Sequence, residues 1–172
     1  VKAKNIKKAI SVLNKLEFNI GSDPQILLQK ASLYLQIKDN KTALSLLVLA
    51  NKKFPREPSI LSALVDYYLG FGSYSEVVSV LKELLEVDSF NGFGLMLLGE
   101  IQIDNGEINE GLANLKKALK AEGLNIDQRM DILIRLQKEK NISTVEITEL
   151  VNFIAITYPK EAKVHALKGD HY

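Results

Sequence analysis

Residues 24–57 read PQILLQKASLYLQIKDNKTALSLLVLANKKFPRE, and this stretch decides the fold. Small and apolar residues in it are spaced four and three positions apart, which places them on one face of a helix. There are two such sets: Leu27, Ala31 and Tyr34, then Ala43, Leu47 and Ala50. Pro55 follows the second set and marks the end of a helix. The stretch therefore predicts two helices joined by a short turn.

The same pattern returns every 34 residues. One repeat before Ala43, Leu47, Ala50 and Pro55, the equivalent residues are Ala9, Leu13, Leu16 and Gly21. One repeat after them, they are Val77, Leu81, Leu84 and Ser89. Two repeats after them, they are Gly111, Leu115, Ala118 and Gly123. The positions equivalent to Leu27, Ala31 and Tyr34 are Leu61, Val65 and Tyr68, then Leu95, Gly99 and Gln102. A fixed period of this length is typical of stacked helical repeats, in which each pair buries its apolar face against its neighbours.

Signals for the start of a helix follow the same period. The residues that precede a helical pattern are Asp23, Glu57, Asn91 and Asn125. Asp and Asn are strong N-caps, and Pro24 and Pro58 stand just inside their helices, where the missing N–H costs nothing. Two capping boxes are predicted, Ser73 with Glu76 and Ser143 with Glu146.

At these residues the sequence resembles the tetratricopeptide repeat (TPR) family. The first full repeat carries the family pattern at Leu27, Ala31, Tyr34, Ala43, Leu47, Ala50 and Pro55, and the third departs from it at Gln102 and Gly111. The resemblance covers essentially the whole chain. It implies an all-α fold, a right-handed superhelical solenoid of antiparallel helix pairs.

The expected division of the chain is a single array with incomplete ends. Its parts are 1–23, the second helix of a truncated repeat; the repeats 24–57, 58–91 and 92–125; an irregular repeat 126–160; and 161–172, the first helix of a truncated repeat. In the irregular repeat the stop residue, Pro159, comes two positions late, and the extra residues are expected in the turn near Asn141 and Ile142. We expect the sequence to be a fragment of a longer array.

Composition narrows the classes of function. Hydrophobic residues make up 47% and charged residues 25% of the 172 residues, which is ordinary for a globular chain with a real core. A net charge of +1 gives no field that would draw the protein onto nucleic acid. There are no cysteines, so disulfides and thiolate chemistry are excluded. No apolar run is long enough for direct membrane insertion.

Groups that could support catalysis are few. The two histidines, His165 and His171, are six residues apart and so lie well off a common helical face. Neither a phosphate-binding loop nor a nucleophile or zinc-protease motif is present. Asp104 to Glu107 matches only part of a calcium loop and is interpreted as a turn. The sequence predicts a protein that is not an enzyme, with no cofactor and no metal.

The TPR resemblance implies that the first helix of each repeat lines a concave groove for a peptide. The candidate groove residues are Gln25, Gln29, Ser32, Gln36, Ser59, Ser62, Asp66, Phe93, Met96, Glu100, Asp104, Asp127, Met130 and Asp131. Five of them are carboxylates, and only Lys138 opposes them in the inferred groove. For any single position, a merely solvated face is the simpler interpretation.

The expected function is a scaffold that holds a protein or peptide segment, neutral to basic and partly apolar, in this groove. The alternative is a structural module that self-associates through its exposed ends, with Leu13 and Leu16 as contacts. A narrower resemblance, carried by Gly123 to Leu133, Tyr158-Pro159 and Ala166 to Asp170, is to a group of exported bacterial TPR proteins. It implies the bacterial periplasm or an outer-membrane association.

Overall fold

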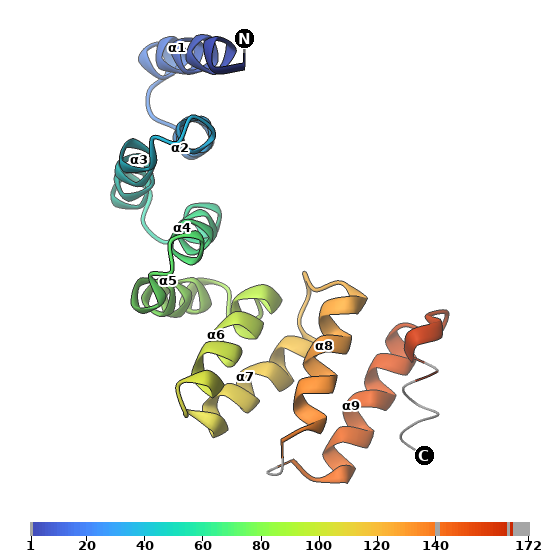
Figure 1. Ribbon diagram of the computed structural model, residues 1–172. Helices are drawn as coiled ribbons and strands as arrows, with labels where there is room; N and C mark the ends of the chain where they lie inside the picture. The colour runs from blue at the N-terminus through green and yellow to red at the C-terminus, as the bar shows by residue number, and fades with distance from the viewer. Residues whose placement is uncertain (1, 140–141, 165, 167–172) are drawn as a thin grey trace. The chain divides into compact units, whose positions relative to one another are not determined.

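The structure is a computed structural model, and it describes residues 2–139, 142–164 and 166. Over these residues it is all-α. The helices are α1 (Lys2–Ile20), α2 (Pro24–Gln36), α3 (Asn40–Lys53), α4 (Pro58–Gly70), α5 (Tyr74–Val87), α6 (Gly92–Asp104), α7 (Ile108–Lys120), α8 (Ile126–Gln137) and α9 (Thr144–Thr157) (Figure 1). They form two compact units, residues 1–87 with α1–α5 and residues 88–172 with α6–α9. We call these unit 1 and unit 2.

Most of the predicted caps are confirmed. Asp23 accepts hydrogen bonds from the amides of Gln25 and Ile26 at the start of α2. Asn91 accepts from Gly94 N at 2.8 Å at the start of α6. These bonds satisfy amides that a helix leaves without a partner in its first turn.

Capping boxes begin the last two helices. Asn125 with Gln128 starts α8, and Ser143 with Glu146 starts α9, as the sequence predicted for the latter. At the other predicted box, the Glu76 carboxylate accepts from the hydroxyl of Ser75 instead of pairing with Ser73.

Unit 1 is built from α2–α3 and α4–α5 pairs, with α1 packed on α2. Its core joins three helices, with the buried residues Leu27, Ala31, Leu47, Ala50, Ile60 and Leu64. Four of the six periodic residues of the first full repeat are in this core; Ala43 is buried outside it, and Tyr34 is half-buried. The helices α2 and α4 lie side by side in the stack (Figure 1).

Unit 2 pairs α6 with α7 and packs α8 against both α7 and α9. The α6–α7 pair is close because two glycines face each other where the helices cross. A Cβ atom placed on Gly99 would lie 2.8 Å from the Gly111 carbonyl oxygen, and one on Gly111 would lie 2.7 Å from the Gly99 carbonyl oxygen. The close approach of α6 and α7 therefore depends on the absence of a side chain at both positions.

A buried arginine joins α8 to the end of α7. The Arg129 side chain is 6% exposed, and its guanidinium donates to the carbonyl oxygens of Leu119 and Ala121, the latter at 2.6 Å. It also lies over the Tyr158 ring, 5.6 Å from the centroid. The last carbonyls of a helix have no partner within it, so Arg129 satisfies that of Leu119 with a charged donor, and also that of Ala121, the residue that follows α7.

The irregular repeat is explained by one connection. Residues 138–143 lie between α8 and α9, and of these Lys140 and Asn141 are outside the described residues. In the other pairs, 37–39, 71–73 and 105–107 lie between the corresponding helices. The α8 helix has 12 residues where α6 has 13, so a connection three residues longer delays Pro159 by two positions. The all-α fold of antiparallel helix pairs is confirmed. Of residues 161–172, where the first helix of a further repeat is expected, only 161–164 and 166 are described; 162–164 and 166 are helical, and Glu161 is not. His165 and His171 lie outside the described residues.

Candidate binding surfaces

In unit 1 the sequence-predicted groove residues lie on α2 and α4, and none is buried. Those exposed on α2 are Gln25, Gln29, Ser32 and Gln36. On α4, Ser59 and Ser62 are half-buried and Asp66 is exposed. The α2–α4 surface is therefore accessible to a ligand in this unit.

A pocket of about 410 Å³ opens on this surface, and two of the predicted residues, Ser32 and Asp66, line it. The remaining lining is apolar and comes from Leu28, Ala31, Leu35, Leu47, Ala63, Tyr67, Gly70 and Phe71. The Tyr67 and Phe71 rings are in contact, with centroids 4.6 Å apart. An apolar depression with a few polar groups at its edge is the usual form of a binding pocket.

The Asp66 carboxylate is the one charged group of this pocket. Partial burial raises its pKa, because the charged form loses hydration. No ion pair to Asp66 is found within the part of the chain that the structure describes. A cationic group bound in the pocket would supply the missing charge.

The apolar lining of this pocket was not predicted from the sequence. Leu28, Leu35 and Phe71 are not on the positions that the TPR resemblance assigns to the groove. The available signal was that Leu28 and Leu35 are one heptad apart on α2, beside Ser32. Phe71 belongs to the turn after α4, where helical periodicity makes no prediction.

A second pocket, of about 490 Å³, lies in unit 1 between α1 and α2. Ala9, Val12 and Leu13 line it from α1, and Gln29, Ser32 and Leu33 line it from α2. Two predicted groove residues, Gln29 and Ser32, thus also face this pocket. Its α1 side is entirely apolar.

In unit 2 the predicted groove residues lie on α6 and α8, again with none buried. Phe93, Met96, Glu100 and Asp104 share a face of α6 because they are three and four positions apart; Phe93 is 38% exposed. On α8, Asp127 and Asp131 are exposed and Met130 is half-buried. We call the surface formed by these residues the α6–α8 face; it combines acidic side chains with an aromatic ring and a thioether.

Two cations that the sequence analysis did not assign to the groove lie against these carboxylates. Arg135 on α8 donates to Asp104 Oδ1 on α6 at 2.9 Å, and Lys163 donates to Asp127 at 2.5 Å. The expectation that Lys138 alone opposes the acidic residues is therefore wrong. It failed because these pairs join residues about 30 positions apart, which helical periodicity within one segment does not connect.

Asp104 and Asp127 are thus paired, but Glu100 and Asp131 are not. No described residue forms an ion pair with Glu100 or with Asp131. Burial raises the pKa of Glu100; Arg135 opposes this effect, and the charges of Asp104 and Asp131 add to it. The α6–α8 face thus holds a half-buried carboxylate among other acids.

Within residues 2–139, 142–164 and 166, no group of three or more His, Cys, Asp and Glu side chains is placed to hold a metal ion. Among the helices that the structure describes, none has both the length and the hydropathy to cross a membrane.

Comparison with known proteins gives likeness in structure only. No family model matches the sequence, and no curated protein matches it. Among solved structures, a tetratricopeptide repeat protein from Parabacteroides merdae has a TM-score of 0.66 at 14% identity, over 98% of this chain and 66% of its own. MamA matches with a TM-score of 0.66 at 14% identity, over 93% and 86%.

YrrB, described as a TPR protein with an unusual peptide-binding site, matches with a TM-score of 0.64 at 16% identity, over 93% of this chain and 81% of its own. At such low identity these likenesses establish the fold and no more. The chain has the helical repeat fold of tetratricopeptide repeat proteins.

Proposed function

We propose that this protein is a binding module that holds a segment of another protein, and that the α2–α4 pocket of unit 1 takes an apolar side chain of that segment. The observation that carries the proposal is the coincidence of two independent indications. The TPR resemblance assigns Ser32 and Asp66 to a ligand groove, and both line an apolar pocket of about 410 Å³.

The chemistry of the pocket selects the segment. Leu28, Leu35 and Phe71 favour an aliphatic or aromatic side chain, because burial of apolar surface is the main source of affinity in such a pocket. Asp66 at the edge favours a neighbouring Lys or Arg and disfavours an acidic segment. The ligand class is therefore a neutral to basic, partly apolar segment. YrrB shows that a peptide-binding site occurs in this fold.

The test compares three fluorescent synthetic peptides of equal length against the full chain by anisotropy. One alternates Leu or Phe with Lys, the second replaces each Lys by Glu, and the third replaces each Leu or Phe by Ser. We expect the first peptide to bind most tightly. We expect Phe71→Ser and Asp66→Lys each to weaken it about tenfold or more, the usual loss at an anchoring contact.

Phe18→Ser is the matched control, since Phe18 is an exposed phenylalanine of the same unit that does not line this pocket. It should leave the affinity unchanged. Equal affinity for the basic and acidic peptides, or binding that is indifferent to Phe71→Ser and Asp66→Lys, would overturn the proposal.

A further inference from the structure

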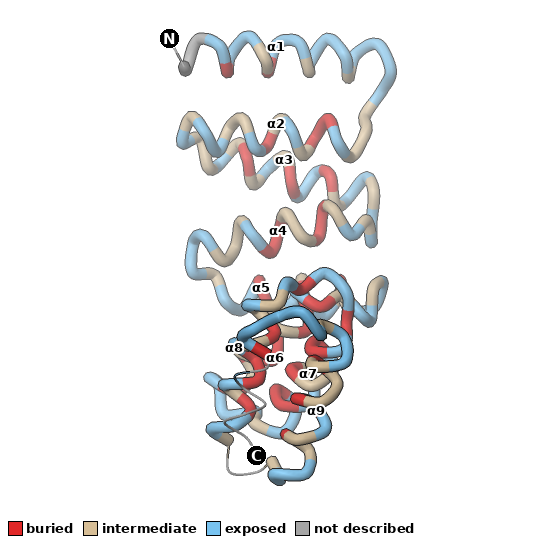
Figure 2. Tube along the Cα trace, turned by 90° about the vertical axis from the view of Figure 1, so that its right-hand side faces the viewer, coloured by how far each residue is buried: buried red, intermediate tan, exposed pale blue. Residues whose placement is uncertain are grey.

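The α1 helix has an apolar face that no described helix covers. Val12 is 64% exposed and Leu16 is 40% exposed. The positions equivalent to Leu16 in the later repeats, Ala50 and Ala118, are fully buried. In Figure 2 the buried and half-buried residues of α1 lie on the side toward α2, and the other residues from Asn5 to Ile20 are exposed. A face of this kind is typical of a contact surface.

This face is also basic. Lys8, Val12 and Lys15 are four and three positions apart, so they share a face, and Leu16 continues it one turn beyond Val12. Lys8 and Lys15 are both exposed. We call Lys8, Val12, Lys15 and Leu16 the α1 open face.

The acid of α1 does not neutralise this face. Glu17 is the only acidic residue of the helix, and it is already held within unit 1 by Lys30 Nζ at 2.8 Å and by the Ser22 hydroxyl at 2.8 Å. It also lies about 100° away from Leu16 around the helix. The α1 open face therefore presents two lysines and two apolar side chains to solvent.

A surface of complementary character exists on the same chain. The α6–α8 face of unit 2 carries Glu100 and Asp131, which have no ion-pair partner among the described residues, beside Phe93 and Met96. The two units also differ in charge. Residues 1–87 have 12 Lys and Arg against 8 Asp and Glu, net +4, and residues 88–172 have 10 against 13, net −3.

We propose that the α1 open face of one molecule docks on the α6–α8 face of a second copy of this chain, with Lys8 and Lys15 facing Glu100 and Asp131, and Val12 and Leu16 facing Phe93 and Met96. Opposite charge fixes the orientation, and the apolar contacts supply affinity. Because the two surfaces differ, two copies can pair reciprocally about a two-fold axis, each α1 open face on the other copy's α6–α8 face, or successive copies can form rings or open chains. This site is separate from the α2–α4 pocket, and each proposal can fail without the other.

The test measures the association of the full chain by sedimentation velocity over a range of concentrations. The parent protein should show a mass that rises with concentration. Lys8→Glu with Lys15→Glu should raise the dissociation constant at least about tenfold, and Val12→Ser with Leu16→Ser should do the same. Glu100→Lys with Asp131→Lys should also abolish self-association.

The decisive step mixes the two charge-reversed variants. In a solution of either variant alone, the contact would bring like charges together. In the mixture, the Glu100→Lys, Asp131→Lys variant still has an unchanged α1 open face. The Lys8→Glu, Lys15→Glu variant still has an unchanged α6–α8 face, and these two unchanged faces fit each other. The two reversed faces fit each other as well. The mixture should therefore associate when neither component does.

Lys7→Glu with Lys41→Glu is the control. It makes the same change in net charge at two exposed lysines outside the α1 open face, and it should associate like the parent. If circular dichroism shows that the Glu100→Lys, Asp131→Lys variant does not fold, the Glu100→Gln, Asp131→Asn variant replaces it. That variant should self-associate more weakly than the parent. A strictly monomeric parent, equal effects of the control and the Lys8, Lys15 variant, or a mixture that stays monomeric would overturn the inference.

Discussion

At the scale of single residues, glycine determines how closely α6 and α7 approach. A Cβ atom on Gly111 would lie 2.6 Å from Ile103 Cγ1 and 2.7 Å from the Gly99 carbonyl oxygen, and one of these is backbone that cannot rotate away. We expect Gly111→Ala to lower the free energy of unfolding by about 1–3 kcal/mol, the usual cost of overpacking. Urea unfolding of the full chain measures it.

Gly70→Ala is the matched control for Gly111→Ala. Gly70 is also helical, and a Cβ atom there would have nothing within 4 Å. Alanine has the higher helix propensity, so this variant should be neutral or slightly stabilised. Equal destabilisation by both substitutions would mean that α6 and α7 are farther apart at Gly111 than these distances indicate.

Glu100 is a half-buried acid on the α6–α8 face. Burial raises the pKa of its carboxyl, so the folded protein binds a proton more tightly than the unfolded chain does, and stability falls as pH rises through the folded pKa. We expect Glu100→Gln to raise the midpoint of thermal unfolding at neutral pH and to lose this advantage in acid. Glu149→Gln, at an exposed glutamate beyond the first turn of α9, should leave the midpoint unchanged. A lower midpoint for Glu100→Gln would contradict the interpretation.

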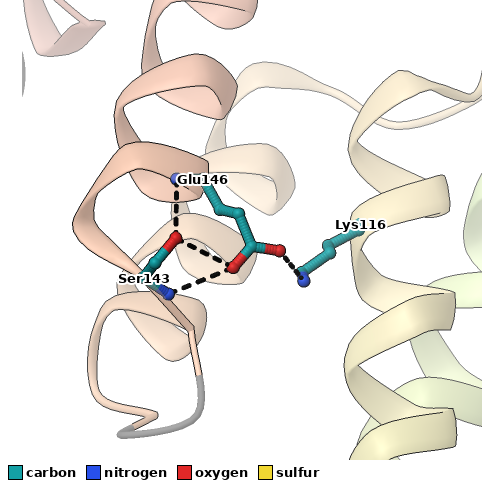
Figure 3. Close-up of polar contacts among 3 residues, drawn as sticks. All are labelled: Lys116, Ser143 and Glu146. Atoms are coloured by element: carbon teal, nitrogen blue, oxygen red, sulfur yellow. Dashed lines mark hydrogen bonds and ion pairs between the residues drawn. The ribbon is translucent and has the colours of Figure 1, made fainter.

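At the scale of the elements, one side chain both caps α9 and ties it to α7. The Glu146 carboxylate accepts from the amide and hydroxyl of Ser143, each at 3.1 Å, and from Lys116 Nζ at 2.7 Å (Figure 3). The bond from Lys116 contributes most to lowering the pKa of Glu146 from 4.5 to about 2, and the bonds from Ser143 add to it. The capping box was visible in the sequence, whereas the bond to Lys116 was not.

We expect the stability that Glu146 contributes to be present above about pH 4.5 and to be lost as pH falls toward about 2, because its folded pKa is depressed. Glu146→Gln keeps a side chain that can complete the capping box and removes the ion pair. Thermal unfolding should show the variant less stable than the parent at neutral pH, with the difference vanishing near pH 2. Glu149→Gln, at an exposed glutamate of the same helix, should follow the parent at every pH; a constant gap between Glu146→Gln and the parent would contradict the assignment.

How much was predictable from the sequence also depends on scale. The helices follow from local periodicity, because side chains three and four positions apart share a face. The role of Arg129, the Arg135–Asp104 pair and the pocket lining at Phe71 were not predicted, because each depends on distances between helices or on turn geometry. Helical wheels predict which face is accessible, but they do not predict which charges on it are already paired.

At the scale of the whole molecule, charge is divided unevenly along the chain. Unit 1 carries +4 and unit 2 carries −3, although the total is only +1. A near-neutral sum therefore hides two oppositely charged parts. This division favours contact between unlike units of different molecules, because opposite charges attract across such a contact.

We expect the self-association of the full chain to weaken as salt rises, because Lys8 and Lys15 meet Glu100 and Asp131 at an exposed surface. Screening acts over about 30 Å at about 0.01 M salt and over about 3 Å at about 1 M. The dissociation constant from sedimentation should therefore increase across this range. The Lys7→Glu, Lys41→Glu variant should show the same salt dependence as the parent, and Val12→Ser with Leu16→Ser should weaken association without changing its salt dependence. Association that is unchanged or tighter at about 1 M would mean that apolar contact alone drives it, and the charge pairing between the units would be wrong.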